Sequence, residues 1–161
     1  MDKDSAENHR RLISRHLILP GVYVGIVLLT YAIARATSGG AYYRILGLCP
    51  PAGSVGMVFE NEAIIVGAFL AVGTPWWYLV GRIGWDAHEH RRGPLSPIVG
   101  AAICALTCFV STAMTVEAHR QDVRDAALNN TALAQYWLVA VLCLGALAST
   151  AFALGDATRR R

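Results

Sequence analysis

Residues 126–155 read AALNNTALAQYWLVAVLCLGALASTAFALG and contain no charged side chain. About 20 apolar residues in a helix, each rising 1.5 Å, cross a hydrocarbon core of roughly 30 Å. Within a single segment, a helix satisfies all of its own backbone hydrogen bonds without water. This stretch therefore predicts a membrane-spanning helix.

Three further stretches without charged side chains are long enough to span: residues 17–34, 63–81 and 93–116. Together the four stretches predict an all-α integral membrane bundle of four transmembrane helices, with residues 1–161 as one domain. The helices are expected at about residues 16–36, 62–82, 95–118 and 131–155. A soluble fold would need an outer layer of amphipathic helices, and 161 residues leave no room for one.

Composition agrees with this class. The chain is 55% hydrophobic, 16% charged and has a mean hydropathy of +0.42, whereas soluble domains have roughly 25% charged residues. Disorder requires higher polarity, and nucleic-acid binding requires clustered basic residues. We therefore expect contacts with the lipid bilayer, with further copies of the chain or with a larger membrane complex, and not with nucleic acid.

The distribution of Lys and Arg predicts the orientation. Ten of the 14 lie in the N-terminal segment, in the connection after residues 63–81 and at the C-terminus, and four lie in the other two connections. The positive-inside rule then places both termini in the cytoplasm, with the protein in the cell (inner) membrane. Aromatic residues near both expected membrane boundaries, such as Tyr136 and Trp85, agree with this orientation.

The first stretch has an alternative interpretation as a signal peptide. Basic residues precede it, and Ala32, Ile33 and Ala34 have the small-residue form of a cleavage site. The apolar run is longer than the usual core of a signal peptide, so we favour a retained helix.

The connection at residues 85–92 reads WDAHEHRR, in which Asp86, His88 and His90 alternate. An extended segment would direct all three side chains to one side, and imidazole with carboxylate suits zinc or a similar ion. A solvated loop whose arginines meet anionic headgroups explains the same residues, and we favour it. These three residues are therefore only weak metal-ligand candidates, and no cofactor is identified.

Polar residues also gather in the two outer connections. Glu60, Glu62, His119 and Arg120 are the residue types that a general acid/base or anion-binding site needs. Salt bridging between the two connections is the simpler interpretation of these charges. They are the catalytic candidates if the protein is an enzyme, which the sequence leaves open.

Ionisable residues are absent from the centres of the four uncharged stretches. Proton relays and charged-substrate carriers display such residues, so ion-coupled transport is disfavoured. A pore lined by hydroxyl groups such as those of Thr74 and Ser111 would lack a recognisable selectivity filter. A pore, like a metal-binding protein, is a less favoured interpretation.

Small residues four apart recur in the apolar stretches. They form the pairs Gly21 and Gly25, Ala101 and Ala105, and Gly145 and Ser149. Such pairs let helix backbones approach closely, either inside one bundle or between copies.

Pro75 is expected to disturb its helix. It lacks an N–H and crowds the carbonyl four residues earlier, at Ala71. We expect a bend with a broken hydrogen-bond ladder between these two residues.

The favoured function is a small polytopic protein that acts through protein and lipid contacts, as a subunit or a self-assembling scaffold. The alternative is a membrane-embedded enzyme or small-molecule-binding protein with a polar site at the outer surface.

Overall fold

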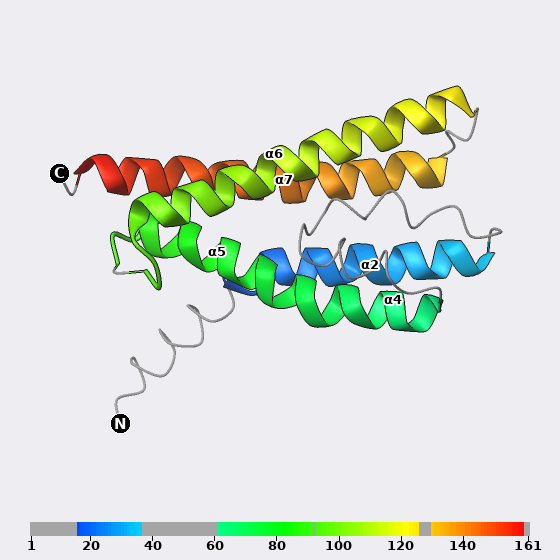
Figure 1. The fold of residues 1–161 in the computed structure, drawn as a ribbon, viewed down its shortest axis with the longest axis horizontal. Coiled ribbons are helices and arrows are strands. Elements are labelled where there is room, and N and C mark those ends of the chain that lie inside the picture. The colour runs from blue at the N-terminus through cyan, green and yellow to red at the C-terminus, as the bar shows by residue number, and fades with distance from the viewer. Residues whose placement is uncertain (1–15, 37–60, 92, 126–129, 160–161) are drawn as a thin grey trace.

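The computed structural model describes residues 16–36, 61–91, 93–125 and 130–159, and every regular element within these ranges is helical (Figure 1). The elements are α2 (Ile18–Ala36), α4 (Glu62–Ala68), the π-helix η2 (Phe69–Gly73), α5 (Thr74–His88), α6 (Pro97–Arg124) and α7 (Asn130–Arg159). The predicted all-helical fold is confirmed for this part of the chain.

Three helical segments are long and apolar enough to cross a membrane. They are Ala63–His88, Pro97–Arg124 and Ala132–Arg159. The first predicted span forms a shorter apolar segment, Ile18–Ile33. The prediction of membrane-type helices is thus confirmed for three elements, with α2 as a shorter apolar helix beside them.

The helices form an antiparallel bundle (Figure 1). The pair α6 and α7 shares the most extensive contact, α5 packs against α7, and α2 contacts both α5 and α7. We call the end where α5 finishes, α6 starts and α7 finishes the α5–α6 end. The opposite end, where α6 finishes and α7 starts, is the α6–α7 end.

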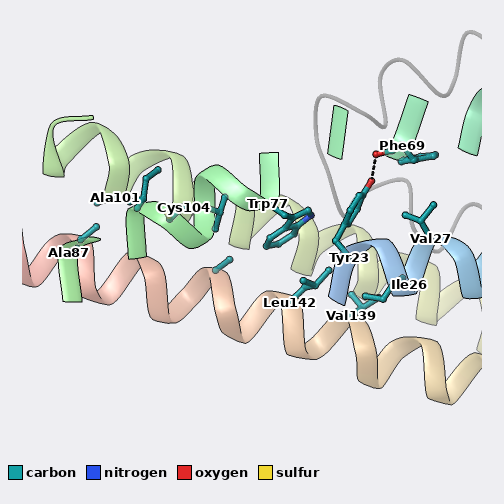
Figure 2. Packing of buried hydrophobic residues seen from close by; sticks show 14 residues of the cluster. Tyr23, Ile26, Val27, Phe69, Trp77, Ala87, Ala101, Cys104, Val139 and Leu142 are labelled. Atoms are coloured by element: carbon teal, nitrogen blue, oxygen red, sulfur yellow. Dashed lines mark hydrogen bonds between the residues drawn. The ribbon is translucent and has the colours of Figure 1, made fainter. Parts of the chain in front are cut away.

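Buried apolar side chains from α2, η2, α5, α6 and α7 form one core (Figure 2). At its centre, the rings of Tyr23 and Trp77 lie 6.3 Å apart between centroids. The Tyr23 hydroxyl donates a hydrogen bond to the carbonyl oxygen of Phe69 at 3.0 Å. All three residues are fully buried, and aromatic side chains supply large contact areas. This contact therefore ties α2 to the span formed by α4, η2 and α5.

That span departs from a regular α-helix at η2, just before Pro75. In a π-helix each carbonyl accepts from the residue five positions later, so the backbone widens locally and accommodates the missing proline donor. The departure from regular α-helical geometry that is expected near Ala71 and Pro75 is present as this π-helix, and the bend stays a prediction. Gly73 ends η2, and a Cβ at this position would overlap the ring of Tyr23.

A short turn joins α5 to α6. The N–H of Arg91 donates to the carbonyl of Asp86 at 2.8 Å and that of His90 to Ala87 at 3.2 Å, which is the Schellman pattern of a helix end. His90 occupies the left-handed position of this motif with φ 55°, where glycine is usual. Helix α6 then begins with proline, where no hydrogen bond is lost, after the N-cap Ser96.

The structure separates the small-residue pairs. Gly145 packs against Leu19, and Ser149 packs against Gly84, so this pair lies inside the bundle. In the α6 pair, Ala101 is buried and Ala105 is exposed. Gly21 and Gly25 are exposed, with nothing within 4 Å of a Cβ built on either. The α2 pair therefore faces away from the bundle.

Candidate functional site

The metal-ligand candidates Asp86, His88 and His90 do not come together as an ion-binding group. Helix α5 continues through His88, so the expected extended geometry is wrong. Two positions apart on a helix, side chains differ by about 200° in direction. Asp86 is buried and accepts from Nε of Arg82 at 3.4 Å, whereas the His88 ring packs on Phe152, with 4.7 Å between centroids. Within the described ranges, no group of three His, Cys, Asp or Glu residues is placed to hold a metal.

His90 is instead part of a contact between two helix ends. Its Nε2 lies 2.8 Å from Nη1 of Arg159, near the end of α7. An arginine nitrogen can only donate, so Nε2 of His90 is the acceptor in this contact. The contact links the turn after α5 to the C-terminal end of α7.

Of the four catalytic candidates, the structure describes the side chains of His119 and Arg120. Glu60 lies outside the described residues, and Glu62 opens α4 with a side chain that the structure does not describe. His119 and Arg120 are both exposed on α6. Arg120 lies 3.9 Å from the Glu117 carboxylate, a surface pair of little energetic weight. The His119 ring stands edge-on to Tyr136, with centroids 5.2 Å apart.

A buried carboxylate that was not among the predicted catalytic candidates lies beside His119. Asp122, one turn further along α6, is fully buried and accepts a hydrogen bond from the Tyr136 hydroxyl at 2.7 Å. A charge at 0% exposure requires such partners, because desolvation without them is costly. The spacing in the sequence already indicated that the two residues are neighbours. Asp122 follows His119 by three residues, so both lie on the side of α6 that faces α7.

A second buried polar contact lies nearby in the bundle. The Gln135 side chain on α7 donates from Nε2 to Oγ1 of Thr30 on α2 at 3.0 Å, and both residues are buried. A hydrogen bond between helices in an apolar environment fixes their mutual rotation. This pair explains how α2 is held at the α6–α7 end.

The α5–α6 end contains a cavity of about 310 Å³ that the sequence did not indicate. Its walls come from the last turns of α5, the turn itself, the start of α6 and the end of α7. The lining residues are Ile83, Ala87, Arg91, Gly93, Pro94, Leu95, Ser96, Pro97, Gly100, Ala153 and Asp156.

Two of these lining residues are charged. Asp156 is 6% exposed and lies in the last turns of α7, where the negative end of the helix dipole disfavours an anion. Arg91 stands at the turn and has its Nε 2.9 Å from a Glu89 carboxylate oxygen. A buried acid and an arginine on the wall of one cavity make this cavity a candidate binding site.

Comparisons with protein-family models, with curated proteins and with solved structures give no match. The functional interpretation therefore rests on the geometry of this chain. Within the described ranges, the α5–α6 cavity is partly open and has a buried carboxylate on its wall. The Asp122–Tyr136 contact beside His119 is the second place where a buried carboxylate meets another element.

An apolar groove of about 240 Å³ lies on the other side of α5. It lies between α2, α5 and α7, and its lining includes Leu19, Trp85, His88 and Phe152. Gly81, Gly84 and Gly145 contribute to its floor. This surface suits an apolar chain and offers no evident reaction chemistry.

Proposed function

We propose that the chain is a four-span membrane protein that acts mainly through protein and lipid contacts, as a small subunit or self-assembling scaffold. The observation that carries this proposal is the apolar outward surface of the long helices. Trp137, Phe109 and Leu144 are 75%, 71% and 64% exposed. A soluble monomer rarely exposes an apolar surface of this extent, whereas lipid tails or a partner helix would cover it.

Helix α2 is proposed as the fourth span. Its apolar segment Ile18–Ile33 is shorter than the three long ones, but a bilayer thins locally around a short helix at a cost of a fraction of a kcal/mol per Å. The buried contacts Tyr23 to Phe69 and Thr30 to Gln135 hold α2 along the same bundle. A helix held in this way shares the membrane depth of its neighbours.

The proposed orientation places both termini in the cytoplasm of a cell with this protein in its inner membrane. Arg82, Arg91 and Arg159 belong to the α5–α6 end, which agrees with a cytoplasmic location under the positive-inside rule. The α6–α7 end then faces outward.

Cys49 tests this orientation, because it belongs to the first outer connection of the proposed topology and lies outside the described residues. A membrane-impermeant thiol reagent added to intact cells is expected to label the wild type and not Cys49→Ala. A cysteine placed in the α5–α6 turn, Ser96→Cys in the Cys49→Ala background, should be labelled only after the cells are opened. The reverse pattern would invert the topology.

The open face of α2 tests association. If Gly21 and Gly25 contact a second copy or a partner, leucine at both positions separates the backbones and removes dispersion contacts there. Gly21→Leu/Gly25→Leu is then expected to reduce oligomer size in mild detergent. Because nothing lies within 4 Å of either Cβ position, the folded bundle should survive.

The matched control is Ala102→Leu/Ala113→Leu, which adds bulk at two exposed positions of α6. This control should keep the wild-type size. A Gly21→Leu/Gly25→Leu variant that melts and elutes like the wild type would assign the α2 face to lipid.

The contact between Asp122 and Tyr136 favours a second candidate function, an outward-facing small-molecule-binding protein or enzyme. There a buried carboxylate, a phenol and the adjacent His119 ring lie together at one membrane surface. The acting groups of such a site would be Asp122, Tyr136 and His119, in place of Glu60, Glu62 and Arg120.

A further inference from the structure

The α5–α6 cavity is lined partly by apolar and partly by charged side chains, as a site for an amphipathic ligand would be. Buried apolar side chains, Ile83, Ala87 and Ala153, form one part, and the charged residues Arg91 and Asp156 form the other. Its volume of about 310 Å³ falls at the lower end of the roughly 300–1,000 Å³ of small-molecule pockets. The cavity therefore admits a compact polar group attached to an apolar one.

Asp156 selects the charge of the inner part of that ligand. Its carboxylate is 6% exposed on the cavity wall, in the last turns of α7. The C-terminal end of the helix dipole adds to the negative potential there. Both the carboxylate and the dipole therefore stabilise a bound cation. A carboxylate offers about four acceptor positions, which lets it accept from a ligand ammonium while keeping contacts within the protein.

A second carboxylate lies close to the cavity. Asp86 lies in the last turn of α5, and its Oδ2 is 3.8 Å from where a Cβ would stand on the cavity residue Gly93. Arg82 contacts this carboxylate through Nε. The C-terminal ends of α5 and α7 thus meet at this cavity, with Asp156 on its wall and the Arg82–Asp86 ion pair close to Gly93.

Arg91 supplies the opposite charge at the cavity. Its Nε lies 2.9 Å from a Glu89 carboxylate oxygen, and a guanidinium carries five N–H donors in a planar fork. That fork matches the geometry of phosphate oxygens. A ligand with a phosphate at Arg91 and an ammonium at Asp156 would match both charges of the lining.

We propose that this cavity binds a phosphoethanolamine headgroup, supplied by phosphatidylethanolamine of the surrounding leaflet. The inference rests on the proposed membrane location, which puts the ends of α5 and α7 at a bilayer surface. The primary ammonium donates to Asp156, the phosphate accepts from Arg91, and the glycerol and upper acyl carbons contact Ile83, Ala87 and Ala153. A choline headgroup has no N–H to donate, and a glycerol headgroup has no cation.

The test is lipid exchange on the full-length protein in mild detergent, followed by native mass spectrometry. The wild type is expected to retain phosphatidylethanolamine about tenfold more than phosphatidylcholine or phosphatidylglycerol, as one charge-assisted hydrogen bond allows. Asp156→Asn should abolish the preference among the three lipids. Arg91→Gln should weaken retention of all three by a similar factor.

Charge-matched controls lie at the α6–α7 end. Asp125→Asn and Arg120→Gln change exposed residues there and should retain the wild-type preference. Size-exclusion profiles and melting temperatures of every variant report whether it folds. If Asp156→Asn does not fold, the comparison of the three lipids on the wild type and Arg91→Gln still decides the proposal.

Several results would overturn the inference. They are equal retention of the three lipids by the wild type, preference for phosphatidylglycerol, and an unchanged preference in folded Asp156→Asn. Displacement of the lipid by soluble phosphoethanolamine at equal concentration would retain the headgroup chemistry but refute the lipid source. If the proposed membrane location is wrong, a separate experiment shows it, because the topology-dependent labelling of Cys49 would then be lost.

Discussion

Gly73→Ala is expected to lower the free energy of unfolding by about 3 kcal/mol, the upper part of the range for overpacking a core. The added Cβ would overlap the ring of Tyr23. That ring cannot rotate away, because it is fully buried, lies beside Trp77 and has its hydroxyl bonded to the Phe69 carbonyl. The substitution therefore pushes α2 off the span that contains η2.

Gly67→Ala, in the same span, is the control. A Cβ at Gly67 meets nothing within 4 Å, and alanine favours a helix over glycine by about 1 kcal/mol. Thermal unfolding in mild detergent should thus show Gly67→Ala at or above the wild-type midpoint and Gly73→Ala well below it.

A double-mutant cycle identifies the cause of this difference. Tyr23→Ala removes the ring that the new Cβ meets, so adding Gly73→Ala to Tyr23→Ala should cost much less than adding it to the wild type. Equal costs in both backgrounds would show that Tyr23 does not occupy the space above Gly73.

The helical class of this fold is readable from the sequence, because charge-free stretches of spanning length have few structural solutions. Which side of such a helix is buried is not readable. Val27 is fully buried and its neighbour Leu28 is 50% exposed, although both are equally apolar. Lipid and protein interior are similarly apolar environments for these side chains, so hydropathy does not distinguish the buried side of the helix from the lipid-facing side.

The candidate sites were harder to predict for a different reason. The sequence prediction grouped Asp86, His88 and His90, but α5 directs Asp86 and His88 to different sides and ends before His90. The cavity depends on a left-handed turn at His90, where a glycine would have been the usual signal. Asp156 lines the cavity together with residues of that turn, although more than sixty positions separate them in the sequence. Only tertiary packing brings them together.

Close approach of α5 and α7 gives the other large expected effect, at Gly84. A Cβ there would overlap the Ser149 side chain and come within 2.9 Å of the Ser149 Cα. A side chain can change rotamer, but a backbone atom moves only with its helix. Gly84→Ala is therefore expected to separate α5 from α7 and to lower the free energy of unfolding by about 3 kcal/mol.

Two further glycines on α7 provide a graded comparison. At Gly145 the nearest atoms to a new Cβ belong to the flexible end of the Leu19 side chain, and at Gly155 nothing lies within 4 Å. Melting midpoints should fall in the order Gly155→Ala, Gly145→Ala, Gly84→Ala, with the first near the wild type. A Gly84→Ala midpoint equal to that of Gly155→Ala would contradict the close crossing of α5 and α7, and with it the wall that positions Asp156 beside the α5–α6 turn.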